Sequence, residues 1–364
     1  MSPRKIAPLV VSLVSLLLLV GCGGGMSTPS TPAPPPSAVA RFALVANSSS
    51  NSISAFAVDS QTGQLTLKNT VPTGGIGSRV IAVEPSAHFA YVANIVSNDI
   101  SVFAIDATTG SLTMVGSPVP AGNGPSFVVV GPAGNVLYAV NQQANNISGF
   151  SINRSTGALT PLSGTVPTDE APVELRFHPS GQFAYVANFN SGDLTIYRVD
   201  SSGGLGLLGA IPVDVSLSSI GMHPSGKFAY AASVSSHEIT TLLINQTSGA
   251  LTPFSPSVTS GDGPTSITVD SQGRFAYVTN AIAGNVSVFA IDASTGALTL
   301  RSTVPAGTEP VALTLDPSGR FAYVANLGSD NVTLFAIDSA TGALTPAGPP
   351  ANAGTGPVTV TLIE

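Results

Sequence analysis

Apolar and polar residues alternate with a period of two along most of this chain, which is the pattern of β-strands with one buried face. Within residues 310–350, Val311 and Leu313 alternate with smaller or polar neighbours and predict a first strand. A Pro-Ser-Gly turn then leads to a second strand over 321–326, a third is expected over 332–337, and a fourth follows the next turn. The pattern predicts a unit of four antiparallel strands.

This unit recurs seven times. The segment Phe-Ala-Tyr-Val-Ala-Asn stands at 89–94, 183–188 and 321–326, and looser copies occur elsewhere. Its last residue, or the equivalent, falls at Asn47, Asn94, Asn141, Asn188, Ser233, Asn280 and Asn326. A period in the forties with several short strands per unit is typical of a propeller. The sequence therefore predicts an all-β, seven-bladed β-propeller with four antiparallel strands per blade.

The two ends of the repeat region complement each other. The chain enters at a second strand, 41–47, with no first strand before it, and it ends on 357–362, which matches the first strands elsewhere. We expect the C-terminal strand to complete the blade begun at residue 41, because this pairing closes the ring and removes two exposed strand edges.

The N-terminus has the features of an export signal. Arg4 and Lys5 precede a short apolar stretch, and Leu-Val-Gly-Cys at 19–22 is similar to a bacterial lipobox. We predict a lipoprotein signal peptide over 1–21, lipidation at Cys22, a tether rich in Pro, Gly, Ser and Thr over 22–40, and the propeller over 41–364. The alternative is an ordinary secretory signal that is cleaved elsewhere.

Charge and cysteine content narrow the choice of partners. Charged residues make up 9% of the chain, the net charge is −7, and no run of Lys or Arg occurs. An acidic protein without a basic patch is not built to bind a phosphate backbone, so nucleic acid is excluded as a partner. Cys22 is the only cysteine. The expected location is the bacterial cell envelope, with the membrane as a partner through the lipid anchor.

An acidic or amide residue begins the turn between the third and fourth strand of each unit, at Asp59, Asp106, Asn153, Asp200, Asn245, Asp292 and Asp338. Such side chains accept hydrogen bonds from the backbone of their own turn, and the following Gly supplies a positive φ. A calcium loop would need further oxygen ligands at alternate positions, and these are missing. We interpret the residues as turn formers and predict no metal ion and no cofactor.

The repeated Tyr-Val-Ala-Asn (91–94, 185–188 and 323–326), with Pro-Ser-Gly before it and Ser-Val-Phe-Ala-Ile-Asp (101–106) after it, resembles YVTN-type propellers. More closely, it resembles the seven-bladed lactonase family that includes bacterial 6-phosphogluconolactonase. The resemblance covers residues 41–364 and implies lactone hydrolysis. It also implies a first strand that reads Pro-Arg-His and a Glu that follows the second strand.

No unit carries this set intact. The best-matched unit has Ser218, Ser219 and Val234 at these positions, and its neighbour has Val173, Glu174 and Phe189. Arg79 matches the Arg position in another unit, where Val80 replaces His. If a site survives, we expect Arg79, Glu174, Arg176 and His237 to build it at one channel mouth.

The longer loops, from second to third strand and from fourth to next first strand, share one face and predict a ligand surface there. Acidic residues recur on it at Asp169, Glu170, Asp214, Asp262 and Glu309, either as a site for a cation or cationic ligand or as solvated carboxylates. His237 beside Glu238 is either an acid–base pair or an exposed pair without a role.

Charges elsewhere have structural interpretations. Glu174 and Arg176 stand two apart on one side of a first strand, and we expect an internal ion pair, with a substrate anchor as the alternative. His178 and His223 precede Pro-Ser-Gly turns and are expected to make turn contacts.

These observations favour a cell-envelope binding module that recognises a small molecule or protein through its variable loops. The alternative is a lactone hydrolase with a rearranged active site, and a third idea is adhesion. The incomplete Arg/His/Glu set weighs against catalysis.

Overall fold

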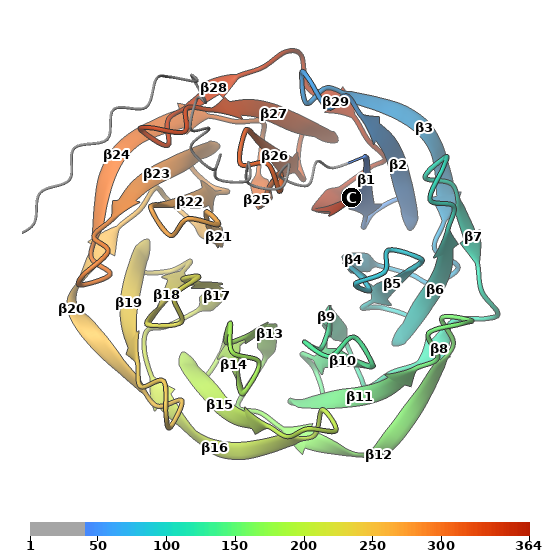
Figure 1. The fold of residues 1–364 in the computed structure, drawn as a ribbon, viewed down its shortest axis with the longest axis horizontal. Helices are drawn as coiled ribbons and strands as arrows, with labels where there is room; N and C mark the ends of the chain where they lie inside the picture. Colours follow the sequence, from blue (N-terminus) through green and yellow to red (C-terminus); the bar gives the residue numbers. More distant parts are fainter. Residues whose placement is uncertain (1–40) are drawn as a thin grey trace, which may run out of the picture. The chain divides into compact units, whose positions relative to one another are not determined.

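The computed structural model describes residues 41–364, which form a ring of seven antiparallel four-stranded sheets around a central channel (Figure 1). The predicted seven-bladed propeller is confirmed. The predicted signal peptide, Cys22 and the tether over 22–40 lie outside the described residues. Within residues 41–364, no helix has the length and apolarity needed to cross a bilayer.

Each blade runs outward from the channel in four steps. The first strands, which face the channel, are β4 (Ser78–Val83), β9 (Pro125–Val130), β13 (Pro172–Phe177), β17 (Leu217–Met222), β21 (Pro264–Val269), β25 (Pro310–Leu315) and β30 (Pro357–Ile363). The second strands are β1 (Phe42–Asn47), β5 (Phe89–Asn94), β10 (Val136–Asn141), β14 (Phe183–Asn188), β18 (Phe228–Ser233), β22 (Phe275–Asn280) and β26 (Phe321–Asn326).

The outer two strands complete the sheets. The third strands are β2 (Ser52–Val58), β6 (Asp99–Ile105), β11 (Asn146–Ile152), β15 (Asp193–Val199), β19 (Glu238–Ile244), β23 (Asn285–Ile291) and β27 (Asn331–Ile337). The fourth strands are β3 (Leu65–Pro72), β12 (Leu159–Pro167), β16 (Leu205–Pro212), β20 (Leu251–Thr259) and β24 (Leu298–Pro305), with the split pairs β7 (Leu112–Met114) and β8 (Val119–Pro120), and β28 (Leu344–Pro346) and β29 (Ala351–Asn352).

The C-terminal strand closes the ring as predicted. One sheet has the order β3-β2-β1-β30, and β1 pairs with β30 in a register that sets Phe42 opposite Ile363. We call this sheet blade 1. Blades 2 to 7 begin at β4, β9, β13, β17, β21 and β25.

The second strands hold neighbouring blades together. Phe183 lies where a Cβ on Gly249, in the hairpin of the next blade, would meet its ring at 2.4 Å, so that hairpin position admits only glycine. The Tyr185 hydroxyl donates to the carbonyl of the same glycine at 3.0 Å. Tyr323 makes the equivalent bond from blade 7 to Gly63 of blade 1, at 2.8 Å. The Phe and Tyr of the repeat therefore join these blades to the next, although within residues 41–364 the buried hydroxyls of Tyr91 and Tyr277 have no hydrogen-bond partner.

Turn chemistry follows the prediction. In blade 6, Oδ1 of Asp292 accepts from the backbone N–H groups of Ser294 and Thr295, both at 2.9 Å. The Ser294 hydroxyl and these N–H groups lower the pKa of Asp292 to about 2, because they stabilise the carboxylate. The acidic residue therefore serves the turn.

The fourth strand of blade 7 differs from the expectation of one strand after residue 343. It is split into β28 and β29, and Pro346, Pro349 and Pro350 lie in or between the two pieces. Proline lacks the N–H that a ladder bond needs, so the strand breaks there.

Candidate functional site: the central channel

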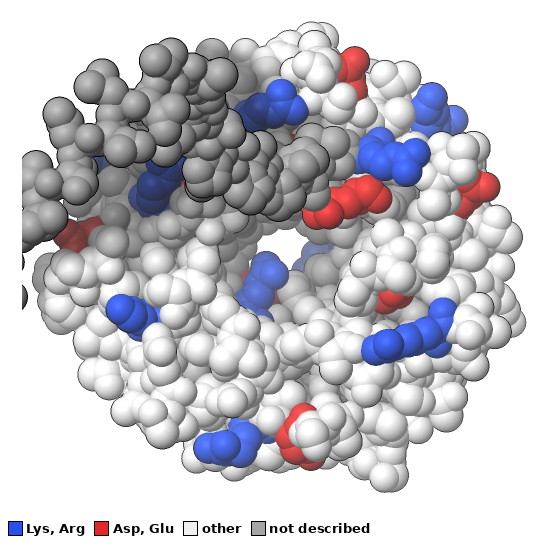
Figure 2. Space-filling model, viewed as in Figure 1, with Lys and Arg blue, Asp and Glu red and all other residues white. Residues whose placement is uncertain are grey.

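First strands from all seven blades line one cavity of about 770 Å³ in the central channel. Figure 2 shows little charge over most of the face in view and basic atoms beside the central opening. The charged residues among those that line this cavity are Arg79, Glu174 and Arg176.

Glu174 and Arg176 form the predicted ion pair. Nη2 of Arg176 lies 2.5 Å from Oε1 of Glu174, and the Arg176 guanidinium also lies over the ring of Phe127. Glu174 is 5% exposed, and its other oxygen accepts the backbone N–H of Ile220 at 2.9 Å. Glu174 thereby joins blade 4 to blade 5, while the Arg176 side chain remains 43% exposed and able to meet a ligand.

Arg79 differs from Arg176 because it has no protein partner. Within residues 41–364, no hydrogen bond or ion pair joins its guanidinium to another residue. Burial lowers its pKa from the usual value, because a partly dehydrated cation is disfavoured. A desolvated cation without a counter-ion is an attractive site for an anion or a developing oxyanion.

Threonines cap the edges of the first strands in one part of the ring. The hydroxyls of Thr268, Thr314 and Thr361 donate to the carbonyls of Leu313, Val360 and Ile81 in the following blade, at 2.9, 2.6 and 2.9 Å. These bonds satisfy backbone acceptors that would otherwise face the channel.

The threonine is missing from the first strands of blades 2 to 5. The equivalent positions hold Ala82, Val129, Arg176 and Gly221, and neither Ala82 nor Val129 has a side chain that can donate to the next blade. Accordingly, no side chain of residues 41–364 bonds to the backbone of Val128 or Leu175. This open edge, Arg79 and the Glu174–Arg176 pair lie in consecutive blades. They form what we call the polar sector, blades 2 to 4.

His237 is placed apart from the other three residues of the predicted site. It does not contribute to the described lining of the channel cavity. Its φ is 61°, and its Nδ1 accepts the backbone N–H of Gly263 at 3.0 Å. Asn51 and Asn98 accept the same bond from Gly77 and Gly124 in other blades. His237 therefore occupies a turn position of the repeat, a periodicity that the sequence already contained.

The acidic residues Asp169, Glu170, Asp214, Asp262 and Glu309 all lie in loops before first strands, as expected, and none is among the residues that line the channel cavity. Asp214 accepts from the Ser236 hydroxyl at 2.5 Å and from the Val215 N–H at 2.7 Å. Across residues 41–364, no three His, Cys, Asp or Glu side chains are grouped closely enough to hold a metal ion.

Asp169, one of these acidic residues, has the carboxyl group of Asp193 as a neighbour. Burial raises the pKa of Asp193, hydrogen bonds from Asn188 and Ser191 oppose the rise, and Asp169 adds to it through its charge and a shared hydrogen bond. Nδ2 of Asn188 lies 2.6 Å from Oδ1 of Asp193. The equivalent partner in blade 6 is Asn285, which carries no charge.

The histidines that precede the short turns have the expected contacts. Nε2 of His178 lies 2.9 Å from the carbonyl of Gly226, and Nε2 of His223 lies 2.9 Å from that of Gly273, each in the next blade. Their Nδ1 atoms accept the N–H groups of Ser180 and Ser225. Both rings therefore serve the joints between blades.

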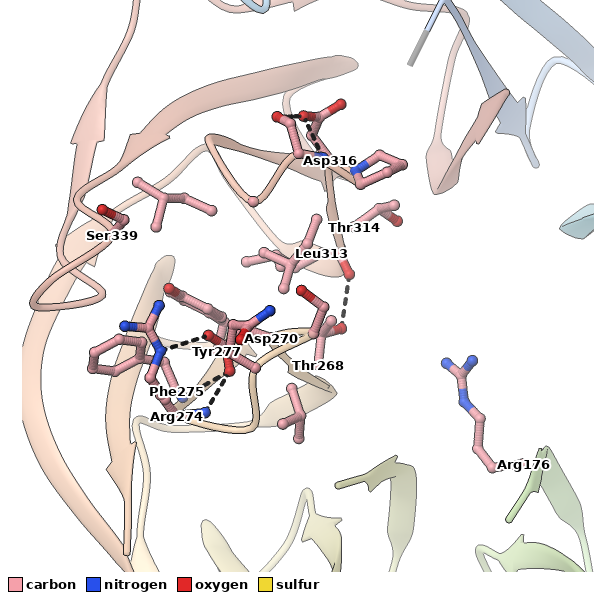
Figure 3. A pocket seen from close by; sticks show the side chains of 18 residues that line it. Arg176, Thr268, Asp270, Arg274, Phe275, Tyr277, Leu313, Thr314, Asp316 and Ser339 are labelled. Carbon is pink, nitrogen blue, oxygen red and sulfur yellow. Dashed lines mark hydrogen bonds and ion pairs between the residues drawn. The ribbon is translucent and has the colours of Figure 1, made fainter. Parts of the chain in front are cut away.

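A second hollow of about 470 Å³ lies between blades 6 and 7, beside the short turns (Figure 3). Its charged residues include Asp270 and Arg274, which face each other at 3.8 Å, and Asp270 also accepts two backbone N–H groups. Arg176 extends toward it from the opposite side of the channel. The carboxylate of Asp270 thus serves its own turn.

A model of the family described as lactonase, 7-bladed β-propeller, matches this chain over residues 37–124, 119–214, 179–263 and 220–361. The chain belongs to this lactonase family. No curated protein matches it.

Solved structures share the fold of this lactonase-family chain. A 6-phosphogluconolactonase candidate from Bacteroides fragilis is 20% identical, with a TM-score of 0.79 over 91% of this chain and 100% of that one. The periplasmic gluconolactonase of Pseudomonas aeruginosa is 19% identical, with a TM-score of 0.77 over 89% of this chain and 99% of that one. At such identities the likeness establishes the fold alone.

The positions to which the family's Arg/His/Glu set was assigned all line the channel cavity: Arg79, Val80, Val173, Glu174, Phe189, Ser218, Ser219 and Val234. The polar set at these positions is Arg79, Glu174 and two serines. The sequence comparison did not single out Gln142 or Phe127, which also line the cavity. Alignment of the residues within each first strand could have found Phe127, and alignment of the residues that follow each second strand could have found Gln142.

Proposed function

We propose that this protein is a lactone hydrolase whose substrate binds in the polar sector of the central channel. The observation that carries the proposal is the unpaired Arg79 guanidinium in a cavity that also holds Glu174. Membership of the lactonase family supports this alternative more than the binding module that the sequence analysis placed first.

The chemistry requires one proton acceptor and one cation. Water attacks the lactone carbonyl carbon, and Glu174 accepts the proton of that water. The ring C–O bond then breaks, and protonated Glu174 returns its proton to the departing ring oxygen, so that water and lactone give one hydroxy acid. Arg79 or Arg176 faces the oxygen that gains negative charge.

To accept a proton from water, Glu174 must first release one of its present hydrogen-bond partners. Its oxygens already contact Arg176 and the Ile220 N–H. The exposed guanidinium of Arg176 can turn toward substrate and release Oε1 for water. The serines at 218 and 219 have other partners: Ser218 donates to the Pro264 carbonyl at 2.8 Å, and Ser219 accepts the Ile267 N–H at 3.3 Å.

The test is the opening of glucono-δ-lactone by purified residues 41–364, followed with a pH indicator against the spontaneous rate. We expect Glu174→Gln to lower kcat about 100-fold, the usual loss when a general base is removed. Arg79→Met should lower kcat/KM at least about tenfold. Glu309→Gln, which changes a carboxylate outside the cavity, should have no effect. A wild-type rate equal to the spontaneous rate on a panel of lactones would refute the proposal.

A binding module without turnover is the second candidate, and the observation that favours it is the full engagement of Glu174 by protein donors. Calorimetric binding of a sugar lactone or its hydroxy acid that is lost in Arg79→Met, without any turnover, would support this candidate.

We also propose that the chain is exported and anchored to the cell envelope through a lipid on Cys22. The lipobox-like residues and the lone cysteine support this proposal. Cys22→Ser should move the protein from the membrane fraction to the soluble fraction and abolish labelling by a palmitate analogue. Membrane fractionation of the variant with continued labelling would contradict it.

A further inference from the structure

The outer edges of the seven blades differ in one respect. A fourth strand at the rim presents unpaired N–H and C=O groups, and proteins protect such edges with charges, prolines or interruptions. β3 carries Lys68 and β24 carries Arg301, while β12 and β20 contain internal prolines. The fourth strands of blades 2 and 7 are split. Among the fourth strands of residues 41–364, β16 has none of these protections.

The contrast is sharpest at one position. In β3, β16 and β24, a bulge leaves one residue without a partner on the third strand: Lys68, Leu208 and Arg301. A leucine thus stands in β16 where two other blades place an exposed cation. Leu208 is 48% exposed and its neighbour Leu207 is 52% exposed.

The surroundings of β16 suit a partner with the same edge. Residues 201–213 contain no charged side chain, between Asp200 and Asp214. Two copies of β16 can therefore pair antiparallel about a twofold axis without placing like charges opposite each other. The same pairing of β3 or β24 would bring two Lys68 or two Arg301 side chains together.

We propose that this protein forms a symmetric dimer through antiparallel pairing of β16 with β16 of a second copy. The pairing joins two four-stranded blades into one eight-stranded sheet. It covers Leu207 and Leu208 and satisfies the backbone groups at the rim. The interface lies on the outer rim, so the proposal does not depend on what the channel binds.

Residues 41–364 close the ring by themselves, so this segment can be used for the test. Sedimentation velocity over a concentration series should reveal a dimer. Leu208→Lys, which installs the residue of β3, should weaken dimerisation by at least about tenfold, or 1.4 kcal/mol. Leu162→Lys, at an exposed leucine of the proline-protected β12, is the matched control and should leave the dimer unchanged.

A reciprocal variant tests whether a pair of leucines on a fourth strand is enough to create a pairing interface. Arg301→Leu creates the same leucine pair on β24 and should add a second interface, with species larger than a dimer. Circular dichroism must show that each variant keeps the wild-type fold. Amide exchange in β16 should slow as wild-type concentration rises. A monomeric wild type at high concentration, or a dimer that persists in folded Leu208→Lys, would overturn the proposal.

Discussion

The first strands on the two sides of the channel wall are equivalent in the repeat but serve different purposes. Blades 6, 7 and 1 place Thr268, Thr314 and Thr361 where each hydroxyl reaches the next blade, and none of their charged residues lines the cavity. The polar sector has Ala82 and Val129 at those positions, and it carries all the charge of the lining. A threonine hydroxyl that donates its one proton to the next blade cannot donate that proton to a ligand. Binding groups are therefore left where the repeat departs from its own rule.

The largest effect should come from removing the strand that closes the capped side. Deletion of residues 357–364 removes β30, which is the partner of β1 and supplies Val360 and Thr361 to the threonine series. We expect loss of cooperative urea unfolding, because blade 1 would expose the edge of β1 to water. Deletion of Glu364 alone, which follows the strand, is the control. A truncated protein with the wild-type unfolding midpoint would disprove the role of this closure.

The threonine caps should each have a measurable effect on stability. Thr314→Val removes the donor to the Val360 carbonyl, and we expect the free energy of unfolding to fall by about 1 kcal/mol. Thr359→Val is the matched control, since no hydrogen bond of the Thr359 hydroxyl is present within residues 41–364. Chemical denaturation of both variants measures the difference. Equal losses would mean that the caps add nothing beyond the polarity of threonine.

The opposite experiment adds a threonine cap to the polar sector, where the cap is absent. Ala82→Thr places a hydroxyl near the Val128 carbonyl, and a bond there should raise the free energy of unfolding by about 0.5 kcal/mol. The same bond should weaken lactone binding, because it occupies an acceptor in the proposed site. Denaturation measures the change in stability of Ala82→Thr, and calorimetry measures the change in its affinity for the lactone. Unchanged lactone affinity in a stabilised variant would show that the open edge plays no part in binding.

A final effect, as small as the preceding one, concerns the carboxyl pair of blade 4. The pKa of Asp193 in the folded protein is raised above its ordinary value of 3.8. Ionisation of Asp193 therefore destabilises the folded protein. This loss of stability is absent below pH 3.8 and develops as pH rises through the folded pKa. Asp193→Asn keeps an acceptor for Asn188 and should stabilise the protein at pH 7 by about 0.5 kcal/mol, but not near pH 3. Asp99→Asn, at the equivalent position of blade 2, is the control. An equal gain in both variants would contradict repulsion from Asp169.

Much of the candidate site could be predicted from the repeat alignment. Glu174 and Arg176 stood out because other blades have Ala312 and Thr314 at their positions, and their spacing on one strand face predicted the ion pair. His237 was selected for the chemistry of its side chain. Its alignment with Asn51 and Asn98 indicated a turn, and the structure places its Nδ1 on the Gly263 N–H.

The sequence by itself determined the number of blades, the four strands of each and the closure by the C-terminal strand. Period-two alternation and turn residues act over a few residues, and the period repeats them along the chain. Only the tertiary structure decided that Arg79 has no partner and that Glu174 reaches the Ile220 N–H in the next blade. Contacts between blades join residues about 46 positions apart, as in that bond. They depend on side-chain length, direction and competition for acceptors, and a pattern along one strand carries none of this information.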